Sequence, residues 1–168
     1  CSNFMPTISV YDPRFCVIYG SDNLAINFCN SAYFRLTFHR AFDVCRNPQK
    51  AMEEIIDLGC DRILTSGQQA TAKAGIPLLK ELHAQADGRI ILLAGCGVNE
   101  ENIAHIASQT GIEEFHFSAR EKRISEMQYR NPTVSMGGTV QIDEYSRQIT
   151  TAERVRNTIA ELTINDWR

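Results

Sequence analysis

Four short segments of the chain carry side chains whose types suit catalysis or ligand binding. The residues concerned are His39, Arg40 and Asp43 in LTFHRAFD, Thr65, Ser66 and Gly67 in ILTSG, Gly95, Cys96 and Gly97 in LLAGCGVN, and His116, Ser118 and Arg120 in EFHFSAR. Imidazoles exchange protons near neutral pH, guanidinium groups bind anions, and thiolates bind soft metals. Together the segments therefore suggest either acid–base chemistry on an anion or metal binding.

An apolar run comes immediately before or within each segment and predicts a buried β-strand. The runs cover residues 34–39, 62–65, 90–94 and 114–118. The third run is apolar on both faces, which is typical of a strand in a parallel sheet covered by helices. Because the runs recur about 25 residues apart, they have the spacing of βα units on a parallel sheet.

Helices are expected between these strands. Asn47 and Pro48 predict a helix start with Asn47 as N-cap, and Gly59 predicts its end. A second helix is expected over 77–86, opened by its proline, and a third from an Asn99 cap to Gly111. The fold class is therefore α/β.

The carboxyl ends of parallel strands deliver their loops to one edge of the sheet, so the four segments are expected to meet there. We call this edge the rim. An enzyme acting there would use a set of acid–base groups and a set of anion-binding groups. The first set is His39, Asp43 and His116, and the second is Arg40, Ser66, Gly95, Gly97 and Arg120. The Gly95–Gly97 turn precedes a predicted helix N-terminus, where backbone N–H groups attract phosphate.

Each of these groups also has a purely structural interpretation. His39 and His116 would then be satisfied histidines in the lower layers of a barrel, and Arg40 and Arg120 would form ion pairs with nearby carboxylates. Glycine would be needed at the tight turn beside Cys96 whether or not a ligand binds. Both interpretations stay open at this point.

A metal site is a further possibility. Cys96 with His39 and His116 offers one thiolate and two imidazoles, a set that suits copper or zinc. The three residues come from different predicted strands, so their spacing in the sequence does not require them to meet.

Composition narrows the classes of function. The chain has 168 residues, 43% of them hydrophobic, and a formal net charge of -3, which indicates a globular protein and neither a nucleic-acid binder nor a membrane protein. The opening residues CSNFMPTISV lack the pattern of a signal peptide. Six single cysteines without a C-x-x-C pair favour a reducing cytoplasm over a disulfide framework. They are Cys1, Cys16, Cys29, Cys45, Cys60 and Cys96.

Two stretches do not follow the alternation of strand and helix. Residues 119–150 form a long polar connection, which is expected to be a functional loop or a mobile segment before a final helix over 152–162. Residues 1–33 contain only apolar fragments broken by proline and glycine. They remain an unassigned segment that could cover one edge of the sheet.

Taken in order, TFHRAFD, RILTSG, AGCGVNEENI and EFHFSAR resemble the C-terminal half of the CutC family. The later MGG at 136–138 and EYS at 144–146 fit the same resemblance. The resemblance implies a TIM barrel whose last four of eight βα units lie within residues 34–168. It also implies a cytoplasmic copper-homeostasis protein that binds Cu(I), with copper as its possible ligand.

The chain departs from that family in length. A (β/α)₈ barrel takes about 250 residues, and the family's early cysteine-bearing strand has no counterpart here. Half a barrel leaves strand edges and an inner face open to water, so association with another copy as a homo-oligomer is expected. Two alternatives remain: a TIM-barrel enzyme acting on a small anionic or phosphorylated substrate, and a truncated fragment without function.

Overall fold

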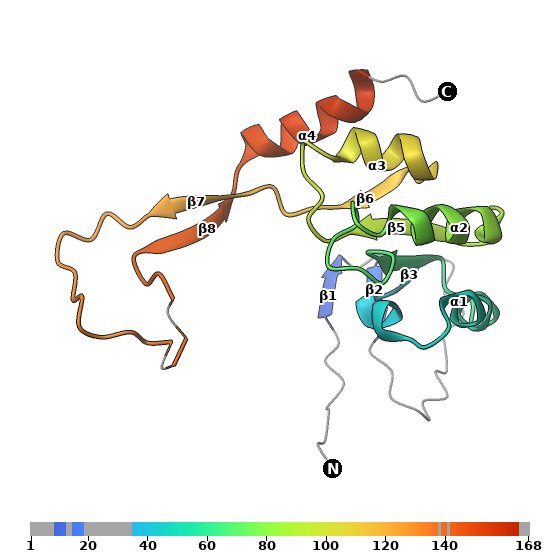
Figure 1. The fold of residues 1–168 in the computed structure, drawn as a ribbon, viewed down its shortest axis with the longest axis horizontal. Coiled ribbons are helices and arrows are strands. Elements are labelled where there is room, and N and C mark those ends of the chain that lie inside the picture. Colours follow the sequence, from blue (N-terminus) through green and yellow to red (C-terminus); the bar gives the residue numbers. More distant parts are fainter. Residues whose placement is uncertain (1–8, 13–14, 19–34, 138, 141, 165–168) are drawn as a thin grey trace, which may run out of the picture.

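The computed structural model describes residues 9–12, 15–18, 35–137, 139–140 and 142–164 (Figure 1). Within these ranges the main sheet has the strand order β1-β2-β3-β4-β5-β6. The strands are β1 (Ser9–Asp12), β2 (Phe15–Ile18), β3 (Arg35–Phe38), β4 (Arg62–Thr65), β5 (Ile91–Gly95) and β6 (Glu114–His116). Strands β2 to β6 run parallel, and β1 is antiparallel to β2. The predicted α/β fold, with strands and helices alternating on a parallel sheet, is confirmed.

The first strands come from the segment that the sequence left unassigned. β2 pairs along β3 from Phe15 opposite Arg35 to Ile18 opposite Phe38. This part of the chain therefore covers the edge of β3, which was one of the alternatives. Cys1 and Cys29 lie outside the described residues.

Three helices cover one face of the sheet (Figure 1). They are α1 (Pro48–Asp57), α2 (Ile76–Ala86) and α3 (Ile103–Thr110), and α4 (Ala152–Ile164) follows at the end of the chain. The hydrophobic core lies between this helix layer and the sheet. Its most deeply buried members are Phe42, Met52, Ile63, Leu79, Leu82, Ile103, Ile106 and Ile112.

The helix starts test the predicted caps. The Asn47 side chain accepts a hydrogen bond from Lys50 N at 3.0 Å, so this N-cap is confirmed. The helix start predicted at Asn99 comes later, because α3 begins at Ile103. Asn99 still makes the bonds of a cap, since its side chain accepts from Glu101 N at 3.0 Å and its carbonyl accepts from Ile103 N at 3.0 Å. Asn102 Oδ1 accepts from Asn99 N at 3.0 Å, and these bonds form a turn that leads into the helix.

Among the elements of the described ranges, no helix lies on the opposite face of the sheet (Figure 1). Register places Leu64 beside Leu93, and Leu93 beside Glu114, on this face. Arg62 donates two hydrogen bonds to Glu114 there, at 2.6 and 2.9 Å. Ile91 is 37% exposed. This surface corresponds to the inner face that half a barrel was expected to leave open to water, and we call it the open face.

Residues 120–150 form an arm that projects from the body (Figure 1). Strand β7 (Arg120–Ile124) pairs antiparallel with β8 (Ser146–Thr150) in a separate two-stranded sheet. The sequence predicted a loop here because the fully exposed REKRI of β7 has no apolar alternation. At the root of the arm, Arg154 of α4 binds Glu100 through two bonds of 3.0 and 2.9 Å and also donates to the Arg120 carbonyl.

None of the helices in the described ranges is long and apolar enough to cross a bilayer.

Candidate functional site

The rim begins at His39, directly after β3. His39 caps the short 3₁₀ helix η1 (Arg40–Val44), and its Nδ1 accepts a hydrogen bond from Ala41 N at 2.9 Å. Its ring stacks on Phe38 with 5.6 Å between centroids. Burial lowers the pKa of His39, so the neutral ring prevails at pH 7. With Nδ1 engaged as an acceptor, Nε2 is the nitrogen that carries the proton.

Asp43, also on η1, is the most densely bonded side chain of the rim. Its carboxylate is 7% exposed and accepts hydrogen bonds from a guanidinium, two hydroxyls and two backbone N–H groups. Burial by itself would raise the pKa of Asp43. The hydrogen bonds, those from Thr65 and Arg40 first, outweigh burial and lower that pKa. Asp43 is therefore a carboxylate at neutral pH.

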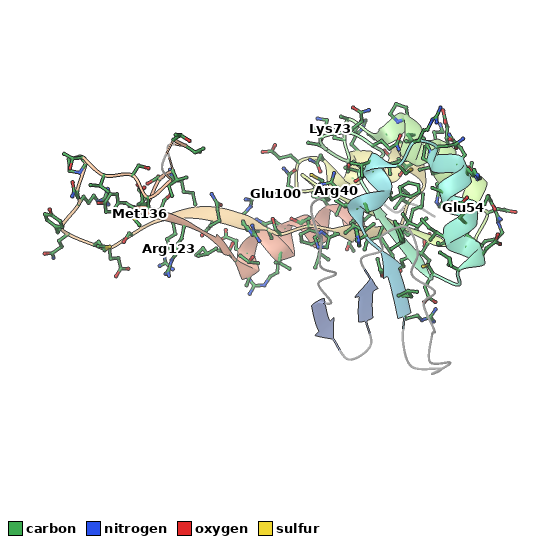
Figure 2. The ribbon with its side chains drawn as sticks, turned by 90° about the horizontal axis from the view of Figure 1, so that it is seen from below. Arg40, Glu54, Lys73, Glu100, Arg123 and Met136 are labelled. Atoms are coloured by element: carbon green, nitrogen blue, oxygen red, sulfur yellow. The ribbon has the colours of Figure 1, made fainter. Side chains whose placement is uncertain are left out.

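Arg40 lies at the outer side of this cluster, on η1 at the end of β3 (Figure 2). Its Nε donates to Asp43 at 2.6 Å and its Nη2 donates to the Ser66 hydroxyl at 2.8 Å. The side chain is 41% exposed. Asp43 raises the pKa of Arg40, and Cys96 adds a smaller contribution in the same direction. The guanidinium therefore connects the ends of β3 and β4.

The loop after β4 is held by close backbone packing. A Cβ on Gly75 would lie 1.9 Å from the Ser66 carbonyl oxygen, and one on Gly67 would lie 2.5 Å from the Gly75 carbonyl oxygen. Gln68 follows in a left-handed conformation with φ 56°. Two glycines are thus required where the loop meets the start of α2.

The loop after β5 contains Cys96 with φ 80°. Its thiol donates to the Ala70 carbonyl at 3.1 Å, and its own carbonyl accepts from Ala72 N at 2.9 Å. The Gly97 carbonyl accepts from the Asn102 side chain at 2.8 Å. A Cβ on Gly95 would lie 2.6 Å from Leu64 Cδ1. Gly97 has φ 73°, so turn geometry favours glycine there whether or not an anion binds. At Gly95 the contact is with the end of a flexible side chain, which can move aside.

The last strand places its residues less centrally. His116 is exposed and lies beside Gly95 in the parallel register. The Ser118 carbonyl accepts from the Thr150 hydroxyl at 2.9 Å. Arg120 is exposed and is the first residue of β7, so it belongs to the arm.

The predicted site residues are thus only partly assembled. Arg40, Asp43 and Ser66 form one hydrogen-bonded cluster, which Cys96 adjoins through Arg40. His116 and Arg120 take part in none of the side-chain bonds of that cluster. In the part of the chain that the structure describes, no group of three or more His, Cys, Asp or Glu side chains is placed to hold a metal ion.

Sequence reasoning missed two members of the rim. Gln68 donates its backbone N–H to Asp43 at 3.2 Å and its side-chain amide to the Cys45 carbonyl at 2.7 Å. Gly75 supports the loop from the start of α2. For Gly75, the available sequence signal was a glycine immediately before Ile76 and Pro77. The left-handed conformation at Gln68 has no sequence signature.

Comparison with known proteins identifies the family. The CutC family model matches residues 27–121, more than half of the chain. A CutC family protein of Bacteroides thetaiotaomicron is 74% identical over 124 residues, which cover 74% of this chain and 50% of that protein. A second, from Bacteroides fragilis, is 69% identical over 128 residues, covering 76% and 51%.

One solved structure of the same family also aligns. The structure is that of a protein from Streptococcus agalactiae that is assigned provisionally as copper homeostasis protein CutC. It is 33% identical, with a TM-score of 0.48, over 49% of this chain and 41% of that one. The chain spans about half the length of the curated relatives it matches. The matched segment carries the motifs of the rim, and the chain belongs to the CutC family.

Proposed function

We propose that this chain acts in copper homeostasis in the cytoplasm and takes Cu(I) as its cargo, with Cys96 as the principal ligand. The observation that carries the proposal is membership of the CutC family. The donor chemistry fits, because a thiolate is a preferred Cu(I) ligand and the Cys96 thiol lies at the rim. His116 is the nitrogen donor that this arrangement supports best, whereas His39 would have to give up its bond from Ala41 N to free a ring nitrogen for copper. Since the described residues hold no group of three metal-binding side chains, binding through this rim is expected to be weak.

Competition for Cu(I) tests this proposal. Wild type, Cys96→Ser and His116→Ala would be titrated without oxygen against a chromogenic Cu(I) chelator. Cys60→Ser is the matched control, because Cys60 is half-buried and precedes β4, away from the carboxyl ends of the strands. We expect the Cu(I) affinity to fall by about tenfold or more in Cys96→Ser, because the variant lacks the thiolate that binds the metal directly, and to fall further when His116→Ala is added. Equal affinity in wild type and Cys96→Ser would remove the rim as the copper site.

A second candidate function is an enzyme that acts on a small anionic or phosphorylated substrate at the same rim. The observation that favours it is Arg40, which is fixed by Asp43 and Ser66 yet 41% exposed. In this proposal Arg40 contacts the anion, and Arg120, Gly95 and Gly97 complete the proposed anion contacts. His116 is the acid–base group that fits better, because His39 Nδ1 accepts from Ala41 N and His39 Nε2 is buried.

Phosphate titration followed by amide chemical shifts tests the second candidate. Shifts at Arg40 and Gly97 that saturate in wild type and vanish in Arg40→Ala are the expected result. Arg35→Ala is the control, because Arg35 is equally cationic but pairs with Asp61 at the opposite end of β3. Unchanged shifts at high phosphate would reject anion binding here.

We also propose that the chain associates with a further copy. The open face supports this, because Leu64, Leu93 and Ile91 lie on it without a covering layer. Light scattering should give at least twice the chain mass of 18.9 kDa, and Leu93→Glu should halve the measured mass. A cooperative monomer would reject association, whereas a chain that unfolds without cooperativity would favour the non-functional fragment.

A further inference from the structure

The contacts of Asp43 have the composition of a ligand site. The Asp43 side chain is only 7% exposed. Four residues direct hydrogen-bond donors at its carboxylate. The donors are Thr65 Oγ1 at 2.6 Å, Ser66 N at 3.0 and 3.1 Å, Ser66 Oγ at 3.0 Å, Gln68 N at 3.2 Å and Arg40 Nε at 2.6 Å. We call this set of donors the Asp43 cradle.

Proteins bind small anions with the same donors. Backbone N–H groups in a strand-end loop, hydroxyls and a guanidinium together satisfy the lone pairs of a carboxylate or phosphate. In the cradle all of them converge on a side chain of the protein itself. A free anion would need these same N–H groups, so Asp43 excludes it from the loop after β4.

The cradle is held by contacts that do not involve Asp43. Gly67 packs against Gly75, Thr65 Oγ1 accepts from Gly67 N at 2.9 Å, and Ser66 Oγ lies 2.6 Å from the Gln69 carbonyl. These contacts would remain if the carboxylate were removed. The donors should therefore keep close to their present geometry, as a preformed site requires.

We propose that the Asp43 cradle is a preformed carboxylate-binding site, and that Asp43 occupies it as an internal ligand. Asp43 is then a positioning residue that fixes Arg40 at the rim, and it does not carry protons. Once its side chain is shortened, the cradle binds a small free carboxylate. The proposal depends on neither copper binding nor catalysis.

The test is rescue of Asp43→Ala by formate, which replaces the missing carboxylate. We expect the Tm of Asp43→Ala to fall by on the order of 10 °C, because buried donors lose their acceptor. Formate at about 200 mM should restore several degrees of this loss, since a ligand that binds only the folded state stabilises it. Sodium chloride at equal ionic strength should restore none.

Asp43→Asn is the matched control. The amide fills the same volume but presents an NH₂ group to the donors, so the variant should be destabilised and should not respond to formate. Alkylation of Cys96, followed by mass spectrometry, reports on Arg40. Its rate should change in Asp43→Ala and return toward wild type with formate, because Arg40 interacts with Cys96.

The possible results separate cleanly. Equal gains from formate and chloride, or an equal formate response in Asp43→Asn, would overturn the proposal. So would an unchanged Tm in Asp43→Ala. If Asp43→Ala does not fold in ordinary buffer, refolding with and without formate replaces the melting experiment. Recovery of folded protein only with formate would then support the proposal, and failure in both would reject it.

Discussion

At the scale of single residues, the Asp43 carboxylate of the rim is held in place by several hydrogen-bond donors at once. Asp43 was expected to be a catalytic group, or else the partner of Arg40 in a structural ion pair. The bond to Arg40 at 2.6 Å fits the structural alternative, although Thr65, Ser66 and Gln68 contribute as much to holding the carboxylate. The sequence identified Arg40, Thr65 and Ser66 as residues of the rim. It could not predict that they converge on Asp43, because that depends on the backbone conformation after Thr65.

The lowered pKa of Asp43 predicts a dependence of stability on acid. A carboxylate whose pKa is lower in the folded state stabilises the fold above its unfolded pKa near 3.8, and this contribution is lost as the pH falls through the folded pKa. The difference in unfolding free energy between wild type and Asp43→Asn should therefore shrink below about pH 4. Urea denaturation from pH 6 to pH 3 measures it. A difference that is constant over this range would contradict the prediction.

The cysteines differ in predicted reactivity. Burial raises the pKa of Cys60 to about 11, with a further contribution from Asp61. At pH 8 this thiol is protonated, so iodoacetamide should modify Cys60 more slowly than the rim thiol Cys96. The rate at Cys60 should keep rising to pH 10 and above. Because the unfolded chain loses this proton near pH 9, the contribution of Cys60 to stability should also be lost between pH 9 and about pH 11.

Mass spectrometry of alkylated peptides over this pH range measures the alkylation rates of Cys60 and Cys96. Fast modification of Cys60 at pH 8 would show that the thiol is accessible to solvent in the native state.

At the scale of elements, local sequence signals predicted most of the strands and helix starts that such signals determine. The strand over 62–65 has the bounds of β4, and the Asn47–Pro48 signal marks the start of α1. The helix after Asn99 begins three residues later than predicted for a cap there, because the Asn99–Asn102 bonds form a turn before the regular helix. β7 and β8 were missed because their pairing is nonlocal and their residues are mostly exposed.

The contact between Gly67 and Gly75 predicts a large effect of a single methyl group. In Gly75→Ala the new Cβ would lie 1.9 Å from the Ser66 carbonyl oxygen, so the backbone must move. We expect a loss of about 3 kcal/mol in unfolding free energy. Gly88→Ala is the control, because Gly88 has φ 71° but no atom within 4 Å of its Cβ position. It should lose only about 1 kcal/mol. Similar losses in urea denaturation would show that the loop can relax.

At the scale of the whole molecule, the body and the arm differ in how they are stabilised. The body has a continuous core, whereas the arm is a two-stranded sheet with many exposed apolar side chains. These are Ile124, Met127, Tyr129, Val134, Met136, Val140 and Ile142. Figure 2 shows the part of the arm that bears Arg123 and Met136 extending away from the body. A two-stranded hairpin is marginally stable by itself.

Shortening the arm should therefore leave the body intact. Residues 125–145 would be replaced by Asn-Gly, since Ile124 and Ser146 pair in register and can flank a two-residue turn. The unfolding free energy should change by less than about 1 kcal/mol, and solubility should rise. Thermal unfolding and sedimentation would measure these two effects. A large loss of stability would mean that the arm supports the body.

The paired glycines of the loop after β4 also constrain protein engineering. A library that diversifies this loop would lose most of its members if positions 67 and 75 were randomised, because each side chain there would push two backbone segments apart. Between them, the exposed side chains at 69–71, 73 and 74 can vary in chemistry, whereas Ala72 is fully buried in the core. New ligand specificity would therefore be introduced by changing those five side chains while the length of the loop and its two glycines are kept.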